Sequence, residues 1–486
     1  MIESSSTFRS RWLLPAFYLA LLAGGTLLFL LIRSVGETET PVGAAIPSGA
    51  TAPSAHNVVL LHVLATITAV IVLGRLLARV FHYLGQPAVI GEVVAGILLG
   101  PSVLGAISPS AMHLLIPDAA ADPHGRVLAA LGTISQLGIV LYMFIVGLEL
   151  NTKMLVKSAH AAVAISHASI VVPFVAGAGL ALWLYPHFAP AGIPFTSFAL
   201  FLGVAMAITA FPVLARILTD RGLDKTPLGV VALSCAATDD VTAWCLLAFV
   251  VGVAQANVSG AISIVIWAAI YIAAMLFVIR PLAVRYLQRG DGRIPAGTIP
   301  GLFIAVLASA LTTEAIGIHA VFGGFLLGVI IPHDSPISRA VKLKLHDVVT
   351  MLLLPAFFAI TGMNTRIGLI SGWDNWLVCG AIILVATLGK FGGTLVAAQL
   401  AGINLRTSAA LGVLMNTRGL MELIVLNIGL SLGVISPTLY AMMVLMALVT
   451  TMTTGPLLAV LWPKSDDEAS DETPAAAAAV AIVHES

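Results

Sequence analysis

Residues 229–253 decide the fold, and they read GVVALSCAATDDVTAWCLLAFVVGV. The run is as long as the roughly 20 apolar residues that cross a bilayer as a helix, yet Asp239 and Asp240 stand near its middle. A charged carboxylate at that depth costs about 3 kcal/mol on insertion scales. Because chance does not keep two of them there, the pair predicts a membrane helix with a functional site at its centre.

The composition of the whole chain is that of a membrane protein. Of 486 residues, 59% are hydrophobic and 9% are charged, against about 25% charged in soluble chains, and the mean hydropathy is +1.04. The formal net charge is zero, which gives no support to nucleic-acid binding. The three cysteines, Cys235, Cys245 and Cys379, lie in apolar runs without disulfide or zinc-type spacing. No cofactor is expected.

Apolar stretches of spanning length recur along the chain. About fourteen are expected, near 12–32, 58–81, 86–103, 129–149, 158–185, 196–219, 229–253, 262–287, 299–314, 317–332, 348–363, 377–400, 408–433 and 438–461. The first is either a signal peptide or a retained extra helix. If it is retained with Arg9 in the cytoplasm, most Lys and Arg residues and both termini are cytoplasmic, as the positive-inside rule requires. The expected parts are an extra span and linker at 1–57, a transmembrane domain at 58–461 and a short acidic, Ala-rich tail at 462–486.

Two segments of the chain resemble each other. Ala-Val-Ile-Gly at 88–91 continues to Gly96, and Ala-Val-Phe-Gly at 320–323 continues to Gly328. The expected topology runs them in opposite directions, which is the pattern of an inverted repeat, an architecture common in secondary transporters. The alternative is a chance similarity between two membrane helices rich in Gly and Ala.

Two spans are interrupted at corresponding places. Thr209-Ala210-Phe211-Pro212 lies within 196–219, and Pro212 removes a backbone donor and clashes with the preceding turn. Asn416-Thr417-Arg418-Gly419 lies within 408–433. Irregular backbone at membrane depth is tolerated only where protein or a water-filled cavity surrounds it. We therefore expect a pair of discontinuous helices that face one cavity, although Pro212 alone is also compatible with a simple kink.

The remaining intramembrane charges are partners for this site. Neighbours on a helix point about 100° apart, so one carboxylate of the Asp239–Asp240 pair can face an ion cavity while the other faces a partner helix; a purely structural polar clamp is the alternative. Lys390 is the expected counter-charge, unless it snorkels to the interface. Arg418 and Glu422 form either an i,i+4 pair or a neutraliser of the broken helix's dipoles. Glu92 either lines a funnel to the site or satisfies a backbone gap.

These residues resemble a known family. The stretches 209–218 (TAFPVLARIL), 236–244 (AATDDVTAW) and 416–429 (NTRGLMELIVLNIG) are similar to the two interrupted helices and the ion-site helix of the second monovalent cation/proton antiporter family, which includes plant-type exchangers and bacterial relatives. The resemblance covers about 58–461. It implies an all-α polytopic membrane protein with an inverted-repeat sodium/proton antiporter-like fold, about thirteen core spans plus the N-terminal extra span, two crossed discontinuous helices, and a homodimer.

The resemblance also implies roles for individual residues. Asp240 would be the essential carboxylate that binds Na⁺, K⁺ or a proton, Lys390 would pair with Asp239, and Thr209 would join the site where the helices cross. Asp239 stands where plant members have Asn and many electrogenic bacterial members have Asp, which favours electrogenic exchange. The sequence ends soon after Trp462, so gating by a large cytoplasmic domain is not expected.

The resulting hypothesis is a secondary transporter, not an enzyme, in a bacterial inner membrane. It exchanges Na⁺ or K⁺ for protons by alternating access and serves pH homeostasis, with monovalent cations, protons and the lipid bilayer as its partners. A channel-like potassium efflux system on the same scaffold is the alternative. An intramembrane aspartyl protease is disfavoured, because its two carboxylates must meet from opposing sides, whereas adjacent residues on one helix point apart.

Overall fold

The computed structural model describes residues 55–118, 122–149, 160–255, 258–288, 297–332 and 335–462, and these residues contain helices and no strand. The expected first span, 12–32, and the tail after Trp462 lie outside the described residues. The helices are α2 (Ala55–Tyr83), α3 (Ala88–Leu99), α4 (Leu104–Ile107), α5 (Pro109–Leu115), α6 (Arg126–Glu149), α8 (His160–Phe188), α9 (Phe195–Ala207), α10 (Phe211–Arg221), α11 (Pro227–Gln255), α12 (Val258–Ala274), η1 (Met275–Ile279), α13 (Arg280–Gln288), α14 (Thr298–Ile316), α15 (Ala320–Ile330), α16 (Pro336–Val348), η2 (Val349–Leu353), α17 (Leu354–Asn364), η3 (Ile367–Leu369), α18 (Gly372–Leu400), α19 (Leu405–Met415), α20 (Leu420–Ser431) and α21 (Pro437–Leu461).

The expected polytopic fold is confirmed. Within the described part of the chain, 11 helices are long and apolar enough to cross a membrane, and the bent pair α19–α20 raises the number to 12. The shorter apolar helix Ala320–Ile330 lies where the remaining expected span was placed. The protein is therefore an integral membrane protein, and each expected span from 58–81 onward corresponds to one of these elements.

One span begins earlier than the sequence suggested. Helical structure runs from Pro336 to Leu369 rather than over 348–363. Ser335 caps its first turn by accepting a hydrogen bond from the Ser338 N–H at 3.1 Å, and Pro336 is the first residue of α16, a position where its missing N–H costs nothing. Lys342 then pairs with Glu149 at the end of α6, with 2.6 Å between Nζ and Oε1. The polar residues that looked like loop thus form an amphipathic extension of the helix.

The start of α6 is also fixed by a polar contact. Asp122 lies before the helix, and its Oδ2 accepts a hydrogen bond from the Val127 N–H at 2.9 Å. This bond holds the pKa of the Asp122 carboxyl below its usual value and satisfies one of the backbone donors that a helix start leaves free.

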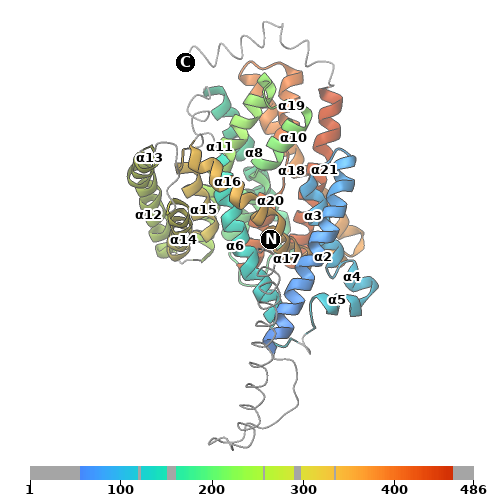
Figure 1. The fold of residues 1–486 in the computed structure, drawn as a ribbon. Helices are drawn as coiled ribbons and strands as arrows, with labels where there is room; N and C mark the ends of the chain where they lie inside the picture. The colour runs from blue at the N-terminus through green and yellow to red at the C-terminus, as the bar shows by residue number, and fades with distance from the viewer. Residues whose placement is uncertain are drawn as a thin grey trace, which may run out of the picture. The chain divides into compact units, whose positions relative to one another are not determined.

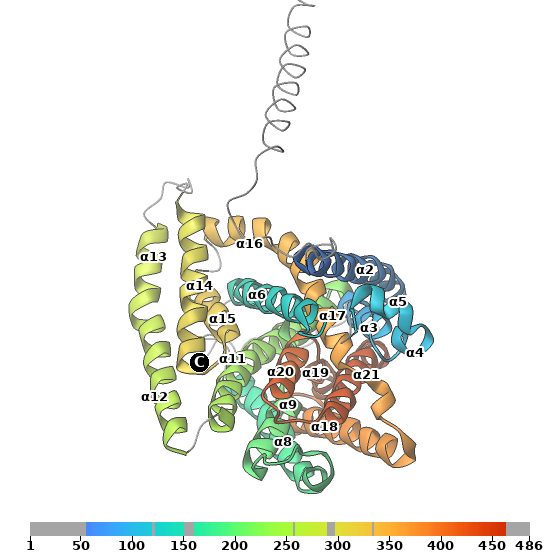
Figure 2. The same ribbon diagram turned by 90° about the horizontal axis from the view of Figure 1, so that it is seen from below.

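The membrane helices are arranged in two bundles (Figures 1 and 2). In the first bundle, α15 packs against α6 and α14, while α17 packs against α3 and α6. In the second bundle, α8 packs against α9, α11 and α18, and α18 packs against α19 and α21. The second halves of the two broken helices belong to this bundle as well, since α10 packs against α11, and α20 packs against α21 and α9. Hydrogen bonds join the bundles where Asn427 of α20 meets α17: Asn364 Nδ2 donates to Asn427 Oδ1, and Asn427 Nδ2 donates to Thr361 Oγ1, both at 3.1 Å.

The internal repeat is visible in how α3 and α15 pack. A Cβ at Gly96 of α3 would lie 2.1 Å from the Phe358 carbonyl oxygen of α17, and a Cβ at Gly328 of α15 would lie 2.3 Å from the Phe144 carbonyl oxygen of α6. The two glycines hold the same place in the similar segments 88–96 and 320–328. Each lets its helix approach a partner's backbone closely, as small residues do in membrane bundles. The two halves thus use equivalent contacts, which supports repeat over chance similarity.

The two interrupted helices cross at their breaks. Between α9 and α10, Ile208 and Ala210 are not helical, and Pro212 lies in the first turn of α10, where helices accept proline. Between α19 and α20, residues 416–419 form the break, and the two halves are bent by 45°. The Ala210 N–H donates to the Thr417 carbonyl at 3.0 Å. The predicted pair of crossed discontinuous helices is therefore confirmed, with the first break at residues 208–210, which overlaps the start of the predicted stretch 209–212.

Candidate ion-binding site

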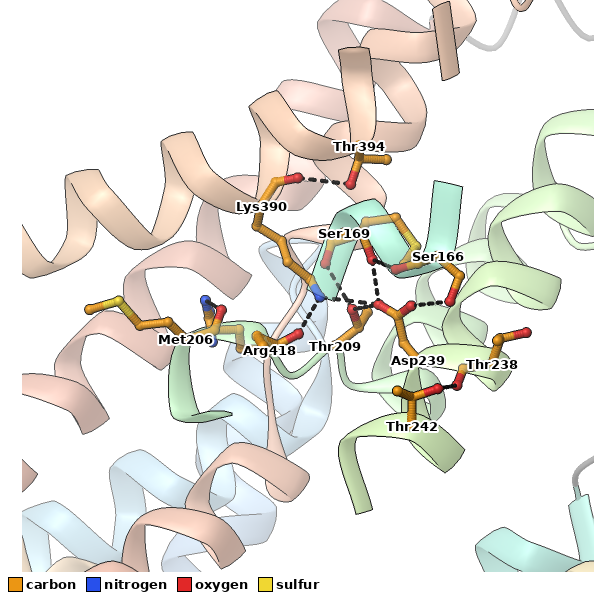
Figure 3. A network of polar contacts seen from close by, with 12 residues as sticks. Ser166, Ser169, Met206, Thr209, Thr238, Asp239, Thr242, Lys390, Thr394 and Arg418 are labelled. Atoms are coloured by element: carbon orange, nitrogen blue, oxygen red, sulfur yellow. Dashed lines mark hydrogen bonds and ion pairs between the residues drawn. The ribbon is translucent and has the colours of Figure 1, made fainter. Parts of the chain in front are cut away.

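Asp239 of α11 lies at the centre of a buried polar network (Figure 3). Its Oδ1 accepts a hydrogen bond from Ser166 Oγ at 2.6 Å. Its Oδ2 accepts from Ser169 Oγ at 2.7 Å, from Thr209 Oγ1 at 2.8 Å and from Lys390 Nζ at 3.1 Å. All five side chains are 0% exposed. Charge-assisted hydrogen bonds are stronger than neutral ones, so these four contacts fix the position of the Asp239 side chain.

Lys390 comes from the middle of α18 and does not snorkel, because it is fully buried. Besides Asp239, its Nζ donates to the Ala207 carbonyl, the last residue of α9. The lysine therefore joins three helices of the second bundle: α18, α11 and the first half of the broken helix. A buried ion pair is tolerated where further hydrogen bonds support it, and the Ala207 carbonyl supplies one such bond to the Lys390 ammonium.

Asp240, the next residue, has different surroundings. It is 0% exposed, yet within the described part of the chain neither of its carboxylate oxygens accepts a hydrogen bond. The Phe211 N–H, at the first residue of α10, faces it, and a helix N-terminus favours negative charge. A buried carboxylate oxygen without a donor carries the full cost of desolvation. The two neighbouring carboxyl groups therefore have very different surroundings.

Arg418 lies in the break between α19 and α20, and its guanidinium hydrogen-bonds to the end of α9, the first half of the other broken helix. Its Nη1 donates to the Ala205 carbonyl at 2.8 Å, and its Nη2 donates to the Met206 carbonyl at 2.7 Å. Together with Lys390 on Ala207, it supplies positive charge to the free carbonyls at the C-terminus of α9, where the helix dipole favours cations. Arg418 Nη1 also lies 2.6 Å from Glu422 Oε2. Both sequence interpretations of this pair therefore describe real contacts.

The other residues of the second break hold its backbone. Thr451 of α21 accepts from the Arg418 N–H at 3.0 Å and donates to the Arg418 carbonyl at 2.8 Å. Thr417 Oγ1 lies 3.5 Å from Thr454 Oγ1, and Asn416 is 5% exposed. The irregular backbone of this break thus hydrogen-bonds to a neighbouring helix, because no water is present in the bilayer core to satisfy its polar groups.

Glu92 does not join this network. It lines a small cavity between α2, α3, η2 and α17, together with Arg75, Gly74, Thr350 and Pro355. A different face of α3, with Val89, Ile90 and Val93, borders the cavity beside Arg418 and Gly419. The structure therefore brings Asp239, Lys390, Thr209, Arg418 and Glu422 together around the crossing but places Glu92 within the first bundle.

Sequence reasoning missed Ser166 and Ser169. They lie three residues apart on α8, so they share one face of the helix, and both point at Asp239 in Figure 3. The only signal was a pair of hydroxyls at that spacing in an apolar span, which is weak because serine is tolerated in membrane helices. No group of three or more His, Cys, Asp or Glu side chains arranged to hold a metal ion occurs among the described residues.

The fold and this network define the class of the molecule: a secondary transporter built from inverted repeats, with ionisable groups where two broken helices cross. A family model described as "Sodium/hydrogen exchanger, transmembrane" matches residues 67–463. The chain belongs to this sodium/hydrogen exchanger family.

Several known proteins are similar to the chain. It is 44% identical over 409 residues to the Na(+)/H(+) antiporter NhaS4 of Synechocystis sp., covering 83% of this chain and 98% of that protein. It is 39% identical over 406 residues to cation/H(+) antiporter 17 of Arabidopsis thaliana, covering 82% of this chain and 48% of that one. It is 32% identical over 397 residues to K(+)/H(+) antiporter 1 of Saccharomyces cerevisiae, covering 79% and 44%. The chain thus spans about half the length of these plant and yeast relatives.

A solved structure shares the fold. The sodium proton antiporter MjNhaP1 from Methanocaldococcus jannaschii at pH 8 aligns with a TM-score of 0.57 at 14% identity, covering 82% of this chain and 99% of that one. At this identity the match establishes the arrangement of the helices and says nothing of ion preference.

Proposed function

We propose that this chain exchanges a monovalent cation, Na⁺ or K⁺, for protons across the membrane, with Asp240 as the carrier group. The observation that supports this most is the contrast between two buried neighbours: Asp239 accepts four hydrogen bonds, whereas Asp240 accepts none from the described residues and is faced only by the Phe211 N–H. A carboxylate without donors gains most from a proton or a cation, and it holds only one of them at a time. That competition is the physical basis of exchange.

The Asp239–Lys390 pair supplies the second charge that can respond to the cation. A cation on Asp240 lies beside Asp239 and competes with the Lys390 ammonium for its negative charge. We infer that cation binding weakens the 3.1 Å contact between Lys390 and Asp239 and lets Lys390 release a proton. This would exchange two protons for one cation, so transport would carry net charge.

Alternating access follows from the two bundles. The breaks, Asp239, Asp240, Lys390 and Arg418 all lie in the second bundle, whose helices pack closely on one another. We propose that this bundle moves as a body against the first and turns the site from one side of the membrane to the other. We further propose a homodimer in a bacterial inner membrane, without a bound cofactor; the family resemblance supports the dimer.

The test is Asp240→Asn in proteoliposomes that contain a pH-sensitive dye. Removing the charge should abolish proton flux driven by Na⁺ or K⁺, whereas Asp374→Asn, on an exposed aspartate at the start of α18, should leave it intact. Retained cation-driven proton flux in Asp240→Asn would contradict the role of Asp240. Na⁺, K⁺ and Li⁺ are tested separately, with and without a membrane potential. Unitary currents, or cation flux without proton flux, would favour a channel instead.

A further inference from the structure

Trp244 lies one helical turn beyond Asp240 on α11. The indole is 3% exposed, and within the described residues its Nε1–H has no acceptor. Side chains four apart on a helix are neighbours, and long helical side chains lean back over the preceding turn. The indole therefore leans towards Asp240. A buried donor without an acceptor thus shares one face of α11 with a buried carboxyl group that only the Phe211 N–H faces and that accepts no hydrogen bond from the described residues.

Each orphan is costly by itself. Leaving a buried polar group without a hydrogen bond destabilises the folded state, and native structures rarely keep one without a reason. The indole ring also packs on Phe325 of α15, with 6.1 Å between the ring centroids. The unbonded Trp244 N–H and the neighbouring Asp240 carboxyl therefore indicate a hydrogen bond between them that forms in another state of the site.

We propose that the Trp244 Nε1–H is the hydrogen-bond donor for ionised Asp240, directly or through one water molecule, when the other carboxylate oxygen holds the transported cation. The inference rests on the proposed function of Asp240. The bond stabilises the charged, cation-loaded carboxyl more than the protonated one, since donors bind ionised acceptors more strongly. Trp244 is thus a positioning residue that sets how well the cation competes with protons, and it does not itself touch the cation.

The contact also depends on the first bundle. Phe325, which supports the indole ring, belongs to α15 in that bundle, whereas Trp244 and Asp240 belong to the second. Figure 2 shows α11 beside α15. Movement of one bundle against the other therefore changes the support of the ring, so the donor is offered to Asp240 in only one arrangement of the bundles.

The experiment measures cation-driven proton flux in proteoliposomes as a function of cation concentration at fixed pH. Trp244→Phe keeps an aromatic ring against Phe325 and removes the N–H. It should raise the half-saturating cation concentration about tenfold, as expected for one hydrogen bond to a charged group, with the maximal rate within about twofold of wild type. Trp244→His, which retains a ring N–H, should recover most of that loss. Trp267→Phe, on a tryptophan that is 56% exposed on α12, is the matched control and should change neither value.

The outcomes separate this inference from the proposed function. Suppose that wild type is active, that Asp240→Asn shows no cation-driven proton flux, and that Trp244→Phe keeps the wild-type half-saturating cation concentration. The inference about Trp244 is then overturned, and the proposed function of Asp240 stands. A variant that loses only maximal rate also overturns it, because the indole then serves packing alone. If wild type shows no cation-coupled proton flux, the proposed function fails and this inference fails with it.

Discussion

Asp239 and Asp240 are consecutive residues on α11, yet Asp239 accepts hydrogen bonds from Ser166, Ser169, Thr209 and Lys390, while Asp240 accepts none from the described residues. The turn of about 100° between neighbours on a helix is enough to produce this contrast. Asp239 faces α8, Thr209 and Lys390, whereas Asp240 faces the start of α10 at Phe211. Two identical neighbouring residues, both 0% exposed, thereby differ in their hydrogen-bond partners, which is the contrast on which the proposed role of Asp240 rests.

The Asp239–Lys390 pair predicts a specific pattern of stability. Lys390→Met leaves a buried carboxylate without its counter-charge, and breaking a buried pair in this way costs about 3–5 kcal/mol. Adding Asp239→Asn removes the unpaired charge and should recover most of the loss. The thermal unfolding of the purified protein in detergent measures both variants. Losses that simply add in the double variant would show that the two groups do not interact.

The hydrogen bond from Ser169 of α8 to Asp239 predicts a larger loss of stability than an ordinary buried serine would give. Ser169→Ala removes a 2.7 Å hydrogen bond to Asp239, and bonds to charged groups are worth about 1.5–3 kcal/mol. Ser408→Ala is the control, because Ser408 is equally buried but donates to the Ile403 backbone carbonyl at 3.2 Å. The control should cost less in the same unfolding measurement. Equal losses would mean that Asp239 gains nothing special from the hydroxyl.

Much of this architecture is predictable because lipid excludes charges and irregular backbone. Asp239, Asp240 and Lys390 therefore mark the site by standing inside apolar runs of the sequence. The same reasoning locates both breaks, through Pro212 in one and the polar run 416–419 in the other. Apolar runs of spanning length give the order of the helices.

The features that the sequence did not predict are contacts between residues far apart in the chain, and residues of types that are common in membrane helices. Serine is ordinary in membrane helices, so Ser166 and Ser169 carried no strong signal. The spacing of four residues suggested the Arg418–Glu422 contact. It did not predict the hydrogen bonds from Arg418 to the α9 carbonyls, because these lie about two hundred residues away in the sequence and come close only where the two broken helices cross. The helix of Pro336–Val348 was missed because its polar face resembled a loop, although Lys342 has a partner on α6.

Arg418 is expected to resist even a conservative change. Its guanidinium bonds Ala205, Met206 and Glu422 at once, and the single ammonium of a lysine cannot reproduce that planar arrangement. Arg418→Lys should therefore lower both the thermal stability and the rate of cation-driven proton flux. Arg366→Lys, on an exposed arginine, should change neither. Wild-type behaviour of Arg418→Lys would mean that positive charge alone, without the fork geometry, supports the end of α9.

The equivalent glycines of the two halves give the final prediction. A Cβ at Gly96 would meet the Phe358 carbonyl oxygen at 2.1 Å, and a Cβ at Gly328 would meet the Phe144 carbonyl oxygen at 2.3 Å, so either helix must move away from its partner. Gly96→Ala and Gly328→Ala should each destabilise the protein by about 1–3 kcal/mol or more, the usual cost of overpacking. Gly380→Ala has open space around it and should be neutral or stabilising, because alanine favours helix by about 1 kcal/mol over glycine. Since Gly96 and Gly328 occupy matching positions of an inverted repeat, their losses in thermal unfolding should be similar. A large loss at one and none at the other would mean that the two halves share a sequence pattern without sharing the packing that it supports.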